Sequence, residues 1–452
     1  MKNLLFLALF LTMLFLGTAG AEAANQYVHA GATGANNGTD WNNAYTSLPA
    51  SLVRGDTYYV ADGVYTGKVL GTPTSGTTPI TIKKATVADH GASTGWLDTY
   101  GDGQAEFSSG FTFSTSYWVF NGTTGGGPGQ WESNFGFFIN MPVSGGQDAA
   151  FRFGSGVTNI TVTHVDVYGR GRTYTSDTDI FYIVSPVSKL TISYSHLRDT
   201  SRTMILTWPA GCNDITIEYT KFSRNGTAEH REAWSAGPDK NVIVRYNLFE
   251  DIMGTGVIAI VNNTGDATNW EIYGNVFYWT GKYADSIINT GLIVNRYDAG
   301  GTPIAVSATN WKFYNNTIAN IRHGSFTTAI HTENANGYLV TNNIWYNNNG
   351  NSGVDGPATG DYNWFYANDS NNTSGAHDVV GSSNPFVDTQ PWITGNWALK
   401  AELAGLNLGA PYNVTLLGTT RGGDGVWDRG AIEFASGGAN PPPSAPSGLR
   451  IQ

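Results

Sequence analysis

The sequence predicts an all-β fold, a single-stranded right-handed parallel β-helix, in which each coil of a solenoid stacks on the coil before it. Seven copies of a short phrase between Asn159 and Ile344 indicate this fold. Each copy has a polar or Gly anchor, three residues rich in β-formers, three more that usually end in a small polar residue, and a nearby apolar position. The anchors are Asn159, Lys189, Asp214, Asn241, Asn269, Asn310 and Gly337, separated by 30, 25, 27, 28, 41 and 27 residues. Spacing of this kind is typical of repeats that each form one coil.

The seventh residue of each copy gives the register of the repeat. It reads Val165, Ser195, Thr220, Asn247, Asn275, Asn316 and Asn343. Four successive asparagines predict a ladder of side-chain amides that hydrogen-bond from coil to coil. Apolar residues at alternate positions, such as Ile215 and Ile217, would stack into a continuous interior, whereas an amphipathic helix would need spacings of three and four. An antiparallel β-sandwich with an accidental repeat is the alternative.

Composition supports a β-rich chain and limits its partners. Of the 452 residues only 13% are charged, while 13% are aromatic, 40% are hydrophobic and 57 are Gly. This suits short strands joined by many turns, and the hydrophobic share is too high for a disordered chain. The formal net charge of −11 argues against nucleic acid as a partner.

The chain divides into three parts. Residues 1–23 are expected to be a secretory signal peptide, with Lys2 before an apolar stretch and a small-x-small cleavage site at 21–23. Residues 24–436 would form the β-helix, and residues 437–452 a Pro-rich tail. We therefore expect a secreted or periplasmic monomer with no membrane span. The single cysteine, Cys212, is expected to be a buried stacking residue and not a reactive thiol.

Both ends of the expected β-helix resemble a known group of proteins. The start contains NNGTDWNNAYTSL and GDTYYVADGVYTG, and the end contains NPFVDTQPWITGNWAL and WDRGAIEF. These segments resemble the ends of secreted right-handed parallel β-helix repeat proteins, a superfamily that includes pectate lyases and other polysaccharide lyases. The resemblance covers residues 26–434 and implies the fold and export. No specific enzyme family is matched. The resemblance does not indicate an activity, because the group holds hydrolases and epimerases as well as lyases.

Basic residues gather in one stretch of this acidic chain. Residues 189–245 hold eight of the 24 Lys and Arg with six acids, a local charge of +2. This predicts a cationic groove suited to an anionic polysaccharide. Lys221 and Arg245 fall on strands, where we expect solvated outward side chains. The arginines expected in turns, where solenoids build sites, are Arg198, Arg202, Arg224 and Arg231.

The densest cluster is RNGTAEHREAW, residues 224–234. Cleavage of a uronate by β-elimination needs a cation on the carboxylate, a base for the adjacent proton and an acid for the leaving oxygen. An arginine can supply the first, His230 either of the others, and Glu232 could orient the imidazole or bind calcium. The expected catalytic residues are Arg202, Arg224, His230 and Glu232. The expected substrate contacts are Arg198, Arg231 and Trp234. The alternatives are an ion-paired surface loop and a tryptophan stacked inside the solenoid.

Glu232, followed by the segment NVIVRYNLFEDIMGT from Asn241, also resembles the chondroitinase-B and alginate-lyase family of β-helix enzymes. Aligning these pieces puts Gly237 near the position of that family's catalytic lysine and Ala259 near its catalytic arginine, so the family's mechanism cannot be carried over. Asp177 and Asp179 form a close carboxylate pair, but the other motifs of inverting polygalacturonases are missing.

These observations predict an exported β-helix protein that binds and cleaves an extracellular, anionic polysaccharide, by lyase chemistry in preference to hydrolysis. No cofactor is required by the pattern, and Ca²⁺ is the ion that Glu232 would suit. The alternative, from another class, is a non-catalytic cell-surface or adhesive β-solenoid.

Overall fold

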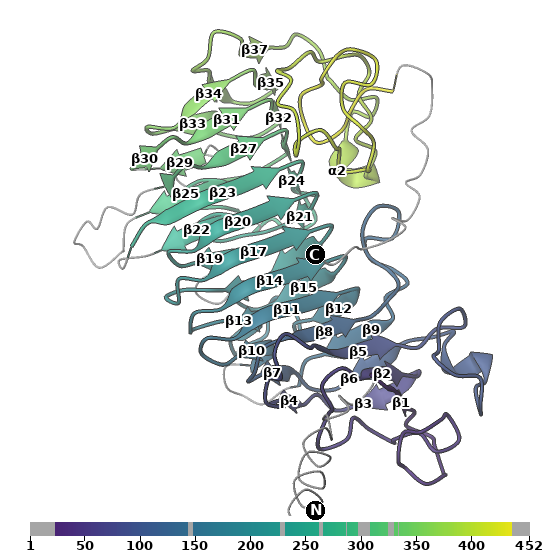
Figure 1. Ribbon diagram of the computed structural model, residues 1–452. Helices are drawn as coiled ribbons and strands as arrows, with labels where there is room; N and C mark the ends of the chain where they lie inside the picture. The colour runs from purple at the N-terminus through teal and green to yellow at the C-terminus, as the bar shows by residue number, and fades with distance from the viewer. Residues whose placement is uncertain are drawn as a thin grey trace, which may run out of the picture.

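Three long parallel β-sheets form the protein, as the computed structural model shows (Figure 1). The structure describes residues 23–142, 148–226, 231–261, 265–285, 287–296, 308–323, 330–332 and 334–435. Most of the expected signal peptide, residues 1–22, and the Pro-rich tail lie outside the described residues. Among the described residues, no helix is long and apolar enough to cross a membrane.

Sheet A, the 14-stranded sheet, contains most copies of the repeated phrase. Its main path is β1 (Asn25–Val28), β2 (Thr57–Val60), β5 (Ile80–Lys84), β8 (Trp118–Asn121), β11 (Thr158–Thr163), β14 (Ser188–Ser193), β17 (Asn213–Glu218), β20 (Lys240–Arg245), β23 (Ala267–Tyr273), β27 (Lys312–Tyr314), β31 (Leu339–Thr341) and β34 (Thr359–Asp361). The short strands β26 (Ala308–Thr309) and β30 (Ala335–Asn336) pair beside this path.

Sheet B, with 12 strands, follows sheet A in each coil. Its strands are β3 (Gly63–Tyr65), β6 (Ala105–Phe107), β9 (Phe137–Asn140), β12 (Val165–Tyr168), β15 (His196–Thr200), β18 (Lys221–Asn225), β21 (Leu248–Glu250), β24 (Val276–Tyr278), β28 (Thr317–Ala319), β32 (Ile344–Tyr346), β35 (Trp364–Tyr366) and β37 (Val379–Val380).

Sheet C, with 11 strands, completes each coil. Its strands are β4 (Val69–Leu70), β7 (Phe111–Phe113), β10 (Asp148–Phe153), β13 (Thr178–Tyr182), β16 (Ile205–Leu206), β19 (Trp234–Ala236), β22 (Ile258–Val261), β25 (Ile293–Arg296), β29 (Ile330–Thr332), β33 (Asn351–Asp355) and β36 (Ser370–Asn372). Helical structure in the described part is limited to the 3₁₀ turn η2 (Asp98–Tyr100) and α2 (Pro391–Thr394).

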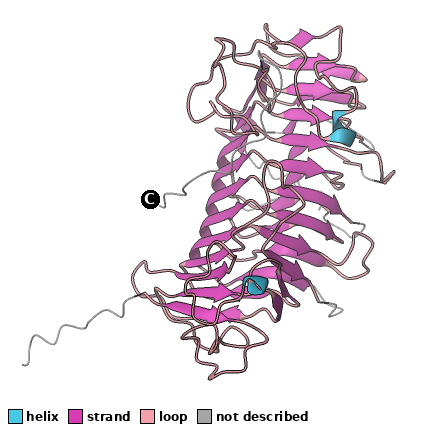
Figure 2. Cartoon of the chain, turned by 90° about the vertical axis from the view of Figure 1, so that its right-hand side faces the viewer, coloured by secondary structure: helices cyan, strands magenta, loops and turns pink. Residues whose placement is uncertain are grey.

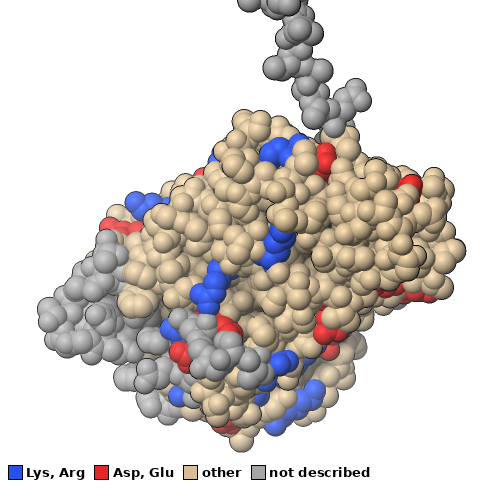
Figure 3. Space-filling view, turned by 90° about the horizontal axis from the view of Figure 1, so that it is seen from below, with Lys and Arg blue, Asp and Glu red and all other residues tan. Residues whose placement is uncertain are grey.

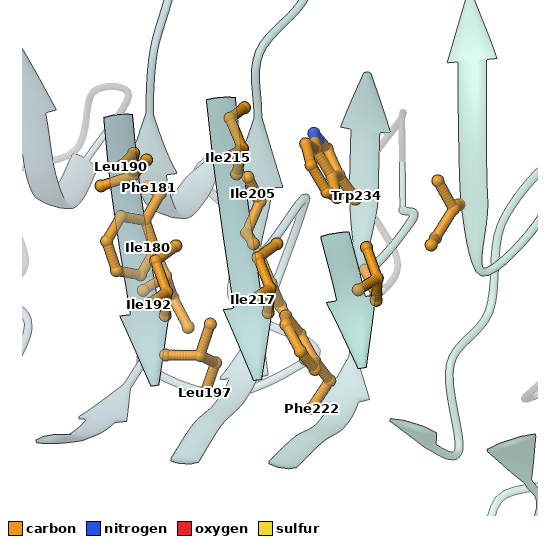
Figure 4. Packing of buried hydrophobic residues seen from close by; sticks show 14 of the residues in the cluster. Ile180, Phe181, Leu190, Ile192, Leu197, Ile205, Ile215, Ile217, Phe222 and Trp234 are labelled. Atoms are coloured by element: carbon orange, nitrogen blue, oxygen red, sulfur yellow. The ribbon is translucent and has the colours of Figure 1, made fainter. Parts of the chain in front are cut away.

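Each coil therefore runs through one strand of every sheet, as in β17, β18 and β19, and all the paired strands are parallel. The inward residues of sheet A keep one register from coil to coil, with Leu190 opposite Ile215 and Ile215 opposite Val242. Their side chains meet those of the other two sheets in a continuous apolar interior (Figure 4). The expected parallel β-helix is thus confirmed. Cys212 is 1% exposed inside it, as expected, and burial raises the pKa of its thiol.

The anchors of the repeat are polar because the backbone there is left-handed. The φ angles are 57° at Asn159, 56° at Asp214, 54° at Asn241 and 58° at Asn269. Asn and Asp tolerate this conformation better than most residues, and Gly337 adopts it without a Cβ penalty. The anchor is the second residue of β11, β14, β17 and β20, so the left-handed residue lies at the start of each of these strands.

The seventh position of the repeat forms the predicted Asn ladder. Asn247 donates its side-chain amide to Asn275 Oδ1 at 3.0 Å, Asn275 to Asn316 at 3.0 Å, and Asn316 to Asn343 at 3.2 Å. Each Oδ1 also accepts the backbone N–H of the preceding rung, and Asn363 continues the ladder. All these asparagines are buried. The ladder satisfies backbone groups at the turn between sheets A and B, where strand pairing stops.

Replacing Asn316 with Leu should destabilise the solenoid strongly. The substitution removes the acceptor of the Asn275 backbone N–H and the donor to the Ile272 carbonyl. An unpaired buried polar group costs about 1–3 kcal/mol. We expect a clear fall in the melting temperature, measured by circular dichroism.

Asn336→Leu is the matched control, because Asn336 is exposed and lies outside the ladder. It should leave the melting temperature almost unchanged. Equal shifts in both variants would contradict a stabilising role for the ladder.

Candidate functional site

The outward side chains of sheet B form two rows that run along the solenoid axis. One row places His196 opposite both Asp166 and Lys221. The neighbouring row runs through Arg198, Ser223, Glu250 and Tyr278. The alternate residues of the same strands face inward, and their rings stack, with centroids of Phe222 and Phe249 4.7 Å apart. The sheet therefore has an apolar inner face and a charged outer face.

Two distant segments cover this outer face. The first is the loop of residues 122–135, between β8 and β9, and the second is the C-terminal segment of residues 384–434. The C-terminal segment is held to the coils by Ala431, whose N–H donates to Thr317 Oγ1 at 3.0 Å, and by Asn315, whose amide donates to the Asp428 carbonyl at 3.1 Å. Figure 2 shows the molecule from the side that carries both segments.

A groove of about 550 Å³ lies between these segments and sheet B. Its lining is largely apolar and aromatic, with a polar floor. The lining residues are Trp131, Glu132, Lys221, Leu248, Tyr278, Gly395, Asn396, Trp397, Ala398, Leu416, Leu417 and Ile432. The ring centroids of Tyr278 and Trp397 are 5.5 Å apart, edge to face.

Lys221 is the centre of the polar floor. Its ammonium lies 2.5 Å from Glu132 Oε1 and 2.6 Å from Glu250 Oε2. Glu250 also accepts the Tyr278 hydroxyl at 2.6 Å and lies 3.3 Å from Arg224 Nη1. We call Lys221, Glu132, Glu250, Tyr278 and Arg224 the Lys221 network. Only Glu132 is well exposed, with 51% of its side chain accessible against 7% for Lys221 and 10% for Glu250.

The network fixes the protonation of its members. Burial raises the pKa of Glu250 and Glu132, but the Lys221 ammonium, helped by Tyr278 and Arg224 at Glu250 and by His196 at Glu132, holds the pKa of both below the usual range. Burial and the Glu250 carboxylate together raise the pKa of the Tyr278 phenol well above its usual value. At neutral pH two ionised carboxylates therefore contact Lys221, and a protonated phenol donates to one of them, Glu250.

Of the expected site residues, Arg224 belongs to this network and Arg198 lies beside it. Arg224 makes two hydrogen bonds to Asp199, at 2.8 and 3.0 Å, in addition to its contact with Glu250. Arg198 binds both oxygens of Asp166 at 2.9 Å and lies 3.4 Å from Asp199. Asp199 thus joins the two arginines, and both end on the outer side of sheet B.

Arg202 and Glu232 each bond to partners outside this network. Arg202 pairs with Asp179 at 3.0 Å and lies 3.9 Å from Asp177. Glu232 is 1% exposed, and its Oε1 accepts the Thr255 N–H at 3.2 Å. Arg231 is half-buried, and His230 lies outside the described residues. Of the predicted cluster, Arg224 joins the Lys221 network, whereas Glu232 is buried and bonds to Thr255.

Trp234 does not reach the surface. It is 2% exposed, its indole N–H donates to Thr207 Oγ1 at 2.9 Å, and its ring lies 4.9 Å from that of Trp270. The expectation that Trp234 stacks on a sugar is wrong, because its position on β19 faces the interior. Trp131, a half-buried tryptophan that lines the groove, was not among the residues expected at the site.

The expected cationic groove is also wrong. Three cations on sheet B, Lys221, Arg224 and Arg198, are paired with four carboxylates: Glu132, Glu250, Asp199 and Asp166. Lys221 is buried and not solvated, because two segments far away in sequence cover it. Basic and acidic side chains are likewise interspersed on the face at the N-terminal end of the solenoid (Figure 3).

Among the residues that the structure describes, no group of three or more His, Cys, Asp and Glu side chains could hold a metal ion. A calcium ion at Glu232 stays a prediction.

Comparison with known proteins finds only distant structural similarities. No family model matches the chain, and no curated protein matches it. Among solved structures it is similar to the pectate lyase Pel9A, with 13% identity and a TM-score of 0.49 over 92% of this chain and 97% of that one. It is also similar to the PL6 family polysaccharide lyase Pedsa3628 from Pseudopedobacter saltans, with 13% identity and a TM-score of 0.42 over 87% and 94%. An alginate lyase from Paenibacillus sp. str. FPU-7 has 14% identity and a TM-score of 0.40 over 73% and 92%.

Replacing Lys221 with Met should lower the free energy of unfolding by about 3–5 kcal/mol at pH 7, because it leaves the buried Glu250 carboxylate without its ammonium partner. The folded-state pKa of Glu250 is lowered, so the pair stabilises the fold above the unfolded-state pKa, and that stability is lost as pH falls. The difference between wild type and variant should therefore narrow from pH 7 to pH 4 in thermal melts.

Lys240→Met is the control, since Lys240 is exposed. It should change stability little at either pH. A difference between wild type and Lys221→Met that is small at pH 7, or that widens toward pH 4, would contradict the paired state of Glu250.

Proposed function

We propose that the protein binds a polysaccharide in the groove over sheet B and cleaves it by β-elimination. The observation that carries the proposal is the position of Lys221. It lies between two carboxylates on the floor of a groove that is also lined by Tyr278, Trp131 and Trp397. We also propose that the protein acts outside the cytoplasm, on the basis of residues 1–23.

The lining of the groove suits a sugar chain. Ligand sites combine apolar and aromatic walls with a few polar groups that fix orientation. The half-buried Trp131 and the buried Trp397 line the groove, and Glu132 and Asn396 are exposed polar groups at the same groove. This mixture supports binding through both the faces and the hydroxyls of sugar rings.

Protonation in the network favours elimination over hydrolysis. A glycoside hydrolase with paired carboxylates needs one of them protonated as general acid. Lys221 holds the pKa of both Glu132 and Glu250 below the usual range, so neither can donate a proton at neutral pH. Tyr278 keeps its proton and can give it to a leaving sugar oxygen.

Glu132 is the carboxylate that a substrate can replace. It is half exposed and lies on a loop, whereas Glu250 is held by Lys221, Tyr278 and Arg224. A uronate carboxylate that takes the place of Glu132 on Lys221 would be neutralised there. The released Glu132 would then accept the proton from the carbon beside that carboxylate, the C=C bond would form, and the C–O bond to the next sugar would break.

Incubation with polyuronates, glycosaminoglycans and neutral glycans tests the proposal. We expect a product with a new C=C bond that absorbs in the ultraviolet, from a uronate-containing polymer only. Tyr278→Phe should lower the rate by about 100-fold or more, since a positioned general acid contributes about 10²–10⁴-fold. Tyr366→Phe is the control, because Tyr366 lies in the same outward row, three coils further along and outside the groove.

The outcomes separate the alternatives. New reducing ends without ultraviolet absorbance would identify a hydrolase. Loss of activity in His230→Ala but not in Tyr278→Phe would place the chemistry in the predicted group of Arg202, His230 and Glu232. No product and no binding from the whole panel would favour a non-catalytic surface or adhesive solenoid.

A further inference from the structure

Three polar side chains on adjacent strands of sheet B form a chain of hydrogen bonds that β-elimination does not use. Ser223 Oγ lies 2.7 Å from His196 Nε2, and His196 Nδ1 lies 3.3 Å from Asp166 Oδ1. They come from β18, β15 and β12, so the order across the sheet is Ser, His, Asp. A nucleophile within hydrogen-bond reach of a base, with the base oriented by a third group, is the arrangement that activates serine in acyl transfer.

We propose that Ser223, His196 and Asp166 form a second catalytic site, which hydrolyses short acyl esters such as O-acetyl groups on sugar hydroxyls. The site does not depend on the proposed elimination, and its chemistry needs only an ester and water.

The surroundings hold each member in the state that this role requires. Arg198 binds both oxygens of Asp166, which fixes that carboxylate beside the imidazole. Burial lowers the pKa of His196, and Asp166 offsets this only in part, so the imidazole is neutral at neutral pH. With its proton on Nδ1 toward Asp166, the ring has Nε2 free to accept the Ser223 proton.

The reaction balances without any further reagent. Ser223 Oγ attacks the ester carbon, and its proton moves to His196 Nε2. The bond from the acyl carbon to the sugar oxygen breaks, and that oxygen takes the proton from His196. Water then attacks the acyl-serine and gives one proton to His196, which returns it to Ser223 as the carboxylic acid leaves.

The loop of residues 122–135 covers this site. His196 is 3% exposed and Ser223 is 0% exposed. The Phe135 ring lies 6.3 Å from the His196 ring and is nearly parallel to it. The same loop carries Glu132, which pairs with Lys221. Lys221 lies opposite His196 in the strand register, so this ion pair holds the loop over the site. A substrate that releases Glu132 from Lys221 would therefore also uncover Ser223, and the enclosed position favours a small acyl group.

Covalent labelling with a fluorophosphonate probe tests the site in the full chain. Peptide mass spectrometry should find the adduct on Ser223. Labelling should be at least about tenfold faster in Glu132→Gln, which loosens the loop. His196→Ala should slow labelling about 100-fold or more, because it removes the general base. Ser201 is the internal control, since it is also 0% exposed but bonds to Thr178 and the Ser176 carbonyl and has no histidine partner among its described contacts.

The result that overturns the proposal does not depend on the folding of a histidine variant. No adduct on Ser223 in folded wild type and folded Glu132→Gln would exclude an activated serine, and equal labelling of Ser223 and Ser201 would exclude it too. Equal rates in wild type and Glu132→Gln would overturn the role of the loop as a cover. Failure of the elimination assay leaves this labelling result unaffected, so the two proposals fail separately.

Discussion

The Asn ladder at the turn between sheets A and B is the interaction on which the rest of the structure depends. The side-chain amide of each rung donates hydrogen bonds to the Asn of the next coil and to a backbone carbonyl of the preceding coil, as Asn316 does with Asn343 and Ile272. A buried amide that is bonded in both directions fixes the height and the register of the coils from Asn247 to Asn363. Since side chains in a strand alternate between faces, this register also decides which residues of sheet B point outward.

The charged outer face of sheet B follows from that register. The first and third residues after each rung point outward, so Lys221 and Ser223 follow Thr220, Glu250 follows Asn247, and Tyr278 follows Asn275. Stacking of coils brings residues that are about 27 positions apart in sequence into hydrogen-bond contact. The ladder thereby turns a repeat in the sequence into a row of functional side chains, and the covering segments convert that row into a groove with buried ion pairs.

The sequence was sufficient to predict the repeated coils, but not the segments that cover them, which have no repeat. Spacing, anchors and the seventh position predicted the solenoid, the buried ladder and the interior position of Cys212. The same register, continued to the first and third residues after the seventh position, would have placed Lys221, Glu250 and Tyr278 on one face. It could not show that Glu132 and Trp397 lie over that face, because loop 122–135 and the C-terminal segment have no repeat. Lys221 was therefore expected in solvent, and the basic stretch was read as a cationic groove although partners such as Asp166 and Glu132 lie outside it.

We propose that Lys221 exchanges Glu132 for a substrate carboxylate. The most direct measurement is a crystal structure of the Tyr278→Phe protein with a bound uronate oligosaccharide. The account predicts a sugar carboxylate within salt-bridge distance of the Lys221 ammonium, with Glu132 displaced from it and Glu250 still in place. An oligosaccharide bound elsewhere, with the contact between Lys221 and Glu132 intact, would contradict it.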